Sequence, residues 1–263
     1  FDRPPFDPNL PGVFTGNRTI LAKNIVESTY LDKRLPMALH NEFSYLPVYP
    51  HYVSFFCQQT PTEGGETALV DGRTVYSNMA SSIRERFEQR QIKYIRNLYC
   101  KRLLSLLVNS VVKVDESWME VFQTNSKKEV EEICGRHGIN FTWRDRNRLR
   151  IEWTLPAIRK HPQSGQPVWF TTAQTILRHP KTDGLLKYGA YRLVYPTTGS
   201  FNFDVTYGDG TRITHDEASH IKEVISQNSV LVKWEEGDVL VLDNHISGHA
   251  RMPFSGDRRL AAS

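Results

Sequence analysis

The sequence predicts a mainly β protein, a β-barrel or sandwich with helices packed outside it. Many short segments are rich in β-branched and aromatic residues, turn signals separate them regularly, and few segments have helical periodicity. The length of 263 residues fits one large domain, or at most two small ones, and 39% hydrophobic residues allow a substantial core. We treat residues 1–263 as a single domain.

The strands are predicted from composition and from the turns that bound them. The first 38 residues are rich in Pro, Asn and Gly, which indicates loops with short extended pieces. From Tyr52 the segment YVSFFCQQ has the aromatic and β-branched residues of a buried strand, and Ser164-Gly165 is the turn of a later hairpin. The expected strands are residues 52–59, 66–70, 93–99, 139–143, 149–156, 167–172, 230–234, 239–242 and 258–262.

Helices are expected in three places. Residues 75–91 carry Met79, Ile83 and Phe87 at helical spacing, so one continuous helix is predicted there. A second helix is expected over 127–137, closed by Gly138, and a third over 216–227 after a turn.

Composition narrows the partners and the location. The net charge of +4 comes from 33 basic and 29 acidic residues spread along the chain, without a basic run that contains aromatics, so no nucleic-acid partner is expected. No apolar stretch approaches the length of a membrane span, and the opening FDRPPFDPNLPG does not resemble a signal peptide. Cys57, Cys100 and Cys134 are odd in number and far apart, which favours a reducing compartment. We therefore expect a cytoplasmic protein.

A metal site is suggested by His40 and Glu42 in the segment LHNEF. If this piece is extended, both side chains leave the same face and can bind one divalent metal. His249 in DNHISGHARMPF is the leading candidate for the third ligand, with His245 as its competitor. Two His and one carboxylate leave about three positions open on an octahedral iron, enough for a bidentate 2-oxo acid and O2.

A 2-oxo diacid also needs a group that holds its distal carboxylate. Arg258 and Arg259 lie on the strand expected after His249, and only one of them can point inward because side chains alternate. Thr67 could add a hydroxyl donor for the same carboxylate.

Three segments resemble the taurine/2-oxoglutarate dioxygenase family (TauD/TfdA-like), including its clavaminate synthase-like members. They are LHNEFSYLPVYPHYVSFFCQQTPTEGGETALVDGRTVY, KHPQSGQPVWFTT and WEEGDVLVLDNHISGHARMPFSGDRRLAAS, and the resemblance covers residues 35–263. It implies a double-stranded β-helix (jelly-roll) core with flanking helices and a partly helical insert near residues 75–195. The family usually has a longer segment before its first motif, so part of the N-terminal region is expected to be missing.

The resemblance also implies the roles of individual residues. It assigns iron(II) binding to His40, Glu42 and His249, and 2-oxoglutarate binding to Thr67 and Arg259, with Arg258 as the alternative if the loop shifts by one residue. Arg251, Trp169 and Ser44 are weaker candidates for contact with the substrate. The list of implied cofactors and co-substrates is Fe(II), 2-oxoglutarate and O2.

The implied reaction is oxidation of an unactivated C–H of a small molecule, with succinate and CO2 as co-products. Hydroxylation of an amino acid or derivative, free or bound to a carrier protein, is the default, because Glu42 matches a subgroup that includes amino-acid oxygenases. Glu42 argues against halogenation, whereas desaturation and ring formation share the same site. Two other classes stay open: a jelly roll that binds a metal or ligand without turnover, and a zinc hydrolase. The sequence does not indicate an oligomeric state.

Overall fold

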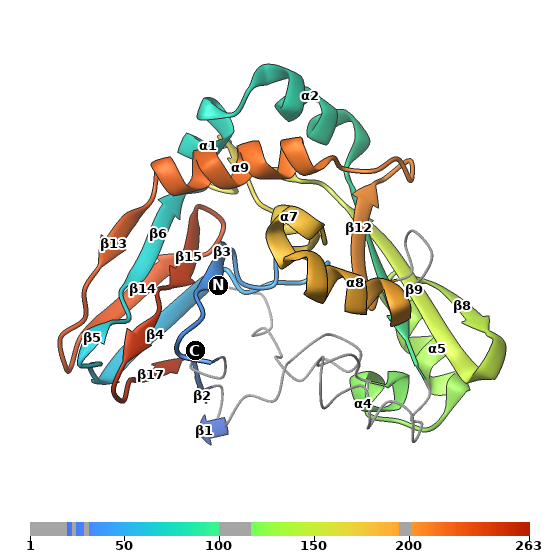
Figure 1. Ribbon diagram of the computed structural model, residues 1–263, viewed down its shortest axis with the longest axis horizontal. Helices are drawn as coiled ribbons and strands as arrows, with labels where there is room; N and C mark the ends of the chain where they lie inside the picture. Colours follow the sequence, from blue (N-terminus) through green and yellow to red (C-terminus); the bar gives the residue numbers. More distant parts are fainter. Residues whose placement is uncertain (1–19, 23–24, 29–31, 100–116, 195–200) are drawn as a thin grey trace.

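The computed structural model describes residues 20–22, 25–28, 32–99, 117–194 and 201–263. Two antiparallel sheets face each other on one side of the molecule, a third sheet lies on the other side, and helices cover the top (Figure 1). The mainly β architecture with packed helices is as expected from the sequence.

The two facing sheets form the jelly-roll part of the fold. One has the strand order β1-β2-β17-β4-β14 and the other β13-β6-β15-β3. The bounds in the first sheet are β1 Ile20–Ala22, β2 Ile25–Glu27, β17 Arg259–Ala262, β4 Tyr52–Gln59 and β14 Val239–Asp243. Those in the second are β13 Val230–Val232, β6 Thr67–Asp71, β15 Ser247–Arg251 and β3 Met37–His40. A short two-stranded antiparallel sheet is formed by β5 (Glu63–Gly64) and β16 (Phe254–Ser255).

A separate apolar cluster fills the space between these sheets. Val53, Phe55 and Cys57 of β4 and Leu260 of β17 belong to it, and Leu69 of β6 packs against it from the opposite sheet. Alternate residues of β4 are buried, as expected for a strand with one face in a core. The interior of the jelly roll is therefore the space onto which Phe55 and Leu69 point.

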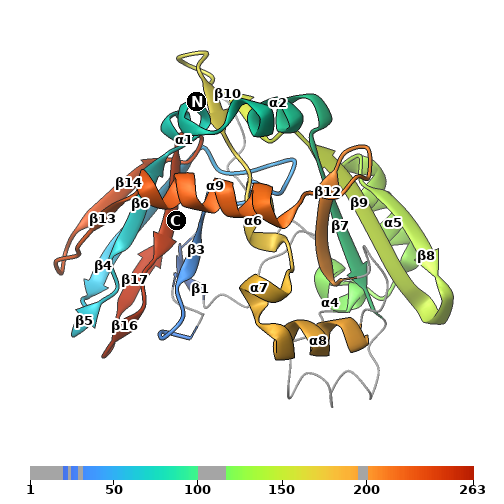
Figure 2. The same cartoon turned by 45° about the horizontal axis from the view of Figure 1, so that its top comes forward.

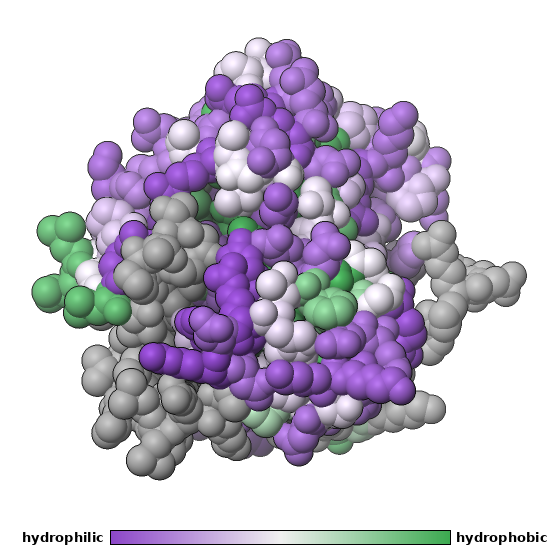
Figure 3. Space-filling model, turned by 90° about the vertical axis from the view of Figure 1, so that its right-hand side faces the viewer, coloured by the Kyte–Doolittle hydropathy of each residue, from purple (hydrophilic) through white to green (hydrophobic). Residues whose placement is uncertain are grey.

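The third sheet has the order β12-β7-β9-β8 and lies largely in the segment expected to be a partly helical insert. Its strands are β12 Phe203–Tyr207, β7 Ile92–Leu98, β9 Arg148–Leu155 and β8 Asn140–Arg144. The insert near 75–195 thus holds three strands of this sheet, and β12, which the sequence did not predict, lies beyond residue 195. Strand β8 is at the edge and mostly exposed, and the surface on this side is largely hydrophilic (Figure 3).

Short helices and a hairpin complete the described part of the chain. They are α4 Trp118–Phe122, α5 Lys127–Arg136, η1 Asp145–Asn147, β10 Ile158–Lys160, β11 Pro167–Trp169, α6 Ala173–Ile176, α7 Pro180–Asp183 and α8 Leu185–Val194. The hairpin expected around Ser164-Gly165 is the β10–β11 pair, and Gly165 takes a positive φ of 67° there. The helix predicted over 127–137 is α5.

The helix predicted over 75–91 is wrong in one respect, because the structure has two helices there. They are α1 Gly72–Asn78 and α2 Ser81–Arg90, separated by extended backbone at Met79 and Ala80. The apolar side chains on both sides of the break are buried in the same core, so helical spacing alone did not reveal it. Asp71 begins α1 by accepting a hydrogen bond from the backbone N–H of Arg73.

The helix predicted over 216–227 is α9 (His215–Gln227), which spans from the sheet that contains β13 to the sheet that contains β12 (Figure 2). A capping box starts it: the Thr214 hydroxyl accepts from the Glu217 backbone N–H, and the Glu217 carboxylate accepts from the Thr214 backbone N–H. Helix α9 packs against α1 and α6, so it ties the two halves of the fold together.

Two further features of the described residues bear on the sequence expectations. Among these residues, no helix combines the length and apolar character that crossing a membrane needs. Cys57 and Cys134 are free and buried, whereas Cys100 lies outside the described residues.

The turn between β14 and β15 is held by a buried histidine. The His245 ring lies among His51, His161 and Phe170, and its Nε2 is 2.9 Å from the hydroxyl of Tyr49. Burial, assisted by the charge of the neighbouring His51, lowers the pKa of His245 to about 4, so the folded protein holds this imidazole neutral at physiological pH.

Because His245 is neutral in the folded protein, we expect the free energy of unfolding to fall in acid. The unfolded chain binds the proton near the ordinary pKa of about 6.5, so the contribution of His245 to stability is complete above that pH and is lost as pH falls from 6.5 towards 4. We expect about 1–2 kcal/mol of this contribution to be lost at pH 5. Urea unfolding of wild type and His245→Gln at pH 7 and pH 5 measures it, because Gln keeps an acceptor for Tyr49 but does not titrate. An equal loss of stability in both proteins would contradict the expectation.

Candidate metal centre

Two histidines face each other across β15 and β3, the last two strands at one edge of the second jelly-roll sheet. Strand β15 pairs antiparallel with β3, and His249 stands directly opposite His40 in this register. Their ring centroids are 4.5 Å apart. The pairing therefore brings together residues from opposite ends of the chain.

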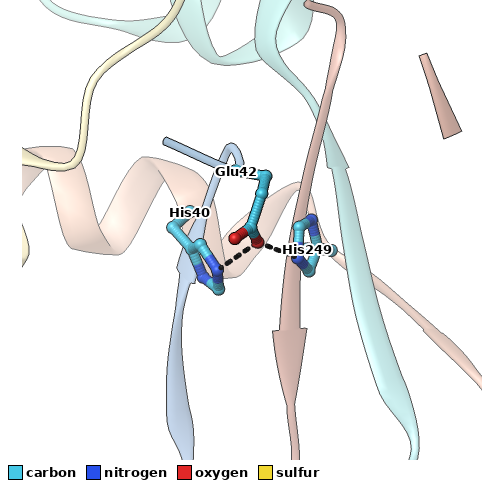
Figure 4. Close-up of side chains that lie close together, drawn as sticks. All are labelled: His40, Glu42 and His249. Carbon is cyan, nitrogen blue, oxygen red and sulfur yellow. Dashed lines mark ion pairs between the residues drawn. The ribbon is translucent and has the colours of Figure 1, made fainter. Parts of the chain in front are cut away.

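Glu42 supplies a carboxylate to the same place. Its Oε2 atom lies 3.6 Å from His40 Nε2 and 3.6 Å from His249 Nε2. Figure 4 shows the three side chains pointing toward one another, from β3, from the segment after it and from β15. Glu42 lies in a turn beyond the end of β3, so only His40 is in the strand. Contrary to the expectation from the sequence, the two side chains therefore do not share one face of an extended segment.

The three donors fit a single divalent metal. Two atoms bound to one metal at about 2.1 Å are at most about 4.2 Å apart, and both 3.6 Å separations lie within that limit. One ligand atom from each residue lies within 4.8 Å of the other two, and within the described part of the chain no other such group of His, Cys, Asp and Glu occurs. Two imidazoles and one carboxylate, all on one side, are the donor set of non-haem Fe(II) oxygenases.

The position of the centre is interior and well defined. His249 is buried, and its ring makes an edge-to-face contact with Phe55 of β4 at 5.2 Å between centroids. The imidazole thus faces the space between the two sheets. Nδ1 of His40 lies 2.8 Å from the carbonyl oxygen of Ala38, a contact that fixes this ring nitrogen as the donor and leaves Nε2 directed at Glu42.

Thr67 lies on β6, the strand on the other side of β15. Its hydroxyl oxygen accepts a hydrogen bond of 2.9 Å from the indole N–H of Trp234. Because an indole only donates, the hydroxyl keeps its own proton for an acceptor such as a carboxylate. Thr67 stands opposite Arg251 in the β6–β15 register, two residues along β15 from His249.

The structure reverses the expectation for Arg258, which directly precedes β17, and Arg259, which begins it. Arg259 is exposed, whereas Arg258 is 6% exposed and its Nε donates to the carbonyl oxygen of Gly65, two residues before Thr67. The expectation that Arg259 points inward is therefore wrong. The physical reason for the exposure of Arg259 is side-chain alternation, because the next residue of β17, Leu260, faces the interior cluster.

Arg258 is accompanied by a second buried guanidinium, that of Arg251. Both lie over the ring of Phe254, at 5.7 Å and 5.2 Å from its centroid. Burial lowers the pKa of Arg258 to about 10, and the charge of Arg251 adds to the effect, so Arg258 stays cationic at neutral pH. Nη2 of Arg251 donates to the carbonyl oxygens of Asp32 and Leu35, which ties the chain before β3 to β15.

The remaining candidates are not brought together in the same way. Trp169 lies on β11 in the main core, with its ring 5.1 Å from that of Phe87, which favours a packing role over contact with the substrate. Ser44 is buried in the turn that follows Glu42. His245 packs with Tyr49 and is not part of the group formed by His40, Glu42 and His249.

The sequence did not single out Asn244 as a functional residue. This side chain is completely buried and hydrogen-bonds the backbone of Glu42. The one signal in the sequence was its place in the Asp243-Asn244 pair shortly before His249.

The chain is similar to known proteins over most of its length. The family model for the taurine catabolism dioxygenase TauD, TfdA family matches residues 7–262. The chain is 30% identical over 241 residues to the dapdiamide synthesis protein DdaC of Enterobacter agglomerans, covering 90% of this chain and 68% of that protein. It is 26% identical over 236 residues to a clavaminate synthase-like protein of Arabidopsis thaliana, covering 88% of this chain and 65% of that protein.

A solved structure shows the same fold. An asparagine oxygenase in complex with Fe(II), 2S,3S-3-hydroxyasparagine and succinate has a TM-score of 0.50 at 10% identity, covering 91% of this chain and 55% of that chain. The chain spans 68% and 65% of the lengths of the two curated relatives. Since the family match extends over nearly all of its residues, the chain belongs to the TauD, TfdA family of dioxygenases.

Proposed function

We propose that this chain is an Fe(II)- and 2-oxoglutarate-dependent dioxygenase that oxidises an unactivated C–H of a small molecule. The observation that carries the proposal is the convergence of the side chains of His40, Glu42 and His249 on one point. The family to which the chain belongs uses iron and 2-oxoglutarate. Succinate and CO2 are the expected co-products.

In this proposal the three ligands hold Fe(II) on one side and leave the other side open. When bound, the metal supplies the oxygen chemistry, including decarboxylation of the 2-oxo acid and attack on the C–H bond. The protein holds the imidazoles in place through the β3–β15 pairing and shields the centre from water with Phe55. The role of the protein is to position the reacting groups and to exclude water from them.

The co-substrate site is assigned to Arg258 and Thr67. A guanidinium binds a carboxylate with two parallel charge-assisted hydrogen bonds, and the Thr67 hydroxyl has a proton to donate. Arg251 adds positive charge close to Arg258, which suits a dicarboxylate ligand. A zinc hydrolase would need no buried arginine to hold a 2-oxo diacid.

The substrate is proposed to be an amino acid or a derivative of one, free or bound to a carrier protein, with hydroxylation as the default outcome. DdaC is named for dapdiamide synthesis, which supports a role for this chain in small-molecule chemistry. Desaturation and ring formation need the same metal site and remain alternatives. A substrate screen that measures succinate release and product mass separates these outcomes.

Removal of a metal ligand is the first test. Anaerobic addition of Fe(II) and 2-oxoglutarate to wild type is expected to give a metal-to-ligand charge-transfer band in the visible spectrum. His249→Ala is expected to weaken Fe(II) binding by more than about 100-fold, because loss of a ligand costs more than loss of a hydrogen-bond partner around it. Equilibrium titration followed by the absorbance band measures the difference.

The matched control is His137→Ala, at the end of α5 in the other half of the fold, which is expected to bind Fe(II) as wild type does. Absence of the band in wild type, or equal Fe(II) affinity in wild type and His249→Ala, would refute the assigned metal centre.

Arg258 and Arg259 provide a second test. Arg258→Ala is expected to weaken 2-oxoglutarate binding by about 30-fold or more, since losing one partner of a buried charge pair costs about 2 kcal/mol or more. Arg259→Ala should have little effect because this side chain is exposed. Calorimetric titration of the Fe(II) forms with 2-oxoglutarate measures both, and a larger loss for Arg259→Ala would show that the co-substrate is held elsewhere.

A further inference from the structure

The side chain of Asn244 is buried without any exposed surface in the turn between β14 and β15. It lies five residues before His249 and does not belong to the group of metal-ligating atoms. A buried primary amide must satisfy two N–H donors and a carbonyl acceptor, so its partners show what it does.

Those partners are backbone groups of the segment that carries Glu42. The Asn244 side-chain oxygen accepts from the Glu42 backbone N–H at 2.7 Å, and its side-chain nitrogen donates to the Glu42 carbonyl oxygen at 3.0 Å. The same nitrogen donates to the carbonyl oxygen of Pro50 at 2.8 Å. One amide thus holds both backbone polar groups of Glu42, and every hydrogen-bonding group of the amide is used.

Two further hydrogen bonds involve the backbone of Asn244. The Asn41 side chain donates to the backbone carbonyl oxygen of Asn244 at 2.8 Å, and the Asn244 backbone N–H donates to the carbonyl oxygen of His51 at 2.9 Å. Residues 41–42 and Asn244 therefore hold each other through side chains as well as backbone. We call this set of contacts between Asn41, Glu42 and Asn244 the asparagine clamp.

Glu42 needs such support more than the two histidines do. His40 and His249 are fixed by the β3–β15 ladder, whereas Glu42 follows the end of β3 and precedes Phe43, whose φ of 54° is in the left-handed region. A Glu side chain also has one more rotatable bond than Asp, so its carboxylate is positioned only if the backbone that carries it is fixed.

We propose that Asn244 is a positioning residue for the metal centre, which sets the Glu42 carboxylate in place against the two imidazoles without touching the metal. The inference rests on the proposed function, because it concerns the same metal. Groups that orient metal ligands typically change metal affinity by about 10–100-fold when they are removed. The clamp also links the turn before His249 to the segment that carries His40 and Glu42.

The test measures affinity for Co(II) ions alone, without 2-oxoglutarate or substrate. Asn244→Ala is expected to weaken Co(II) binding by about 10–100-fold, and its Co(II) absorption spectrum should shift toward that of Glu42→Ala. Asn41→Ala removes only one of the contacts and leaves both Glu42 backbone bonds, so a smaller loss of affinity is expected.

The matched control is Asn228→Ala. The Asn228 side chain donates to the carbonyl oxygen of Val224 and accepts from the side chain of Asn78, so it also joins segments far apart in the sequence. It lies at the end of α9, outside the asparagine clamp. Both asparagine variants are expected to lower the midpoint of thermal unfolding, whereas only Asn244→Ala should change the Co(II) affinity and spectrum. If Asn244→Ala does not fold, Asn244→Asp gives the same test, because it keeps the acceptor for the Glu42 N–H and loses both donors.

The outcomes separate the two proposals. If wild type binds Co(II), and the Asn244 variants bind it with wild-type affinity and spectrum, Asn244 is only structural and this inference is overturned while the metal centre stands. If wild type binds no Co(II), the proposed metal centre fails and the inference fails with it.

Discussion

The antiparallel pairing of β15 with β3 is the constraint on which the candidate site depends. It places His249 opposite His40, and the pairing of the other edge of β15 with β6 places Arg251 opposite Thr67. A shift of one residue in β15 would turn His249 and Arg251 to the other face of the sheet. The register of β15 therefore positions His249, a candidate metal ligand, and Arg251, which lies opposite Thr67 of the proposed co-substrate site.

The charges around this strand are arranged by burial. Arg251 and Arg258 are both buried and lie over the same phenyl ring, an arrangement that costs free energy unless their charges are compensated. Arg251 donates to the backbone carbonyl oxygens of Asp32 and Leu35, and Arg258 donates to that of Gly65. In the proposed function, the carboxylates of 2-oxoglutarate would add negative charge close to these two guanidiniums. The carboxylate of Glu42 lies with the imidazoles, which keeps negative charge beside the metal position.

Much of this architecture could be predicted from local sequence. The strand starting at Tyr52 and the helices at Lys127 and His215 were predicted because composition and caps are local properties. The motifs also pointed to His40, Glu42 and His249, whose ligand atoms the structure brings within 4.8 Å of one another. The break between α1 and α2 was not, since apolar side chains on both sides of it face one core. Strand β12 was missed because its pairing with β7 is a long-range contact. Asn244 was not singled out because the sequence does not show that its partner is Glu42.

For Arg258 and Arg259, the position implied by motif spacing differs from the burial that the structure shows. Spacing after His249 favoured Arg259, but a loop between two strands can gain or lose one residue without changing either strand. The apolar face of a strand is less tolerant, because moving Leu260 out of the interior would expose it and bury a charge in its place. Leu260 faces the cluster between the sheets, so its neighbour in β17, Arg259, faces away from that cluster. Arg258 lies just before the strand, and its contacts with Gly65 and Phe254, not its distance from His249, account for its burial.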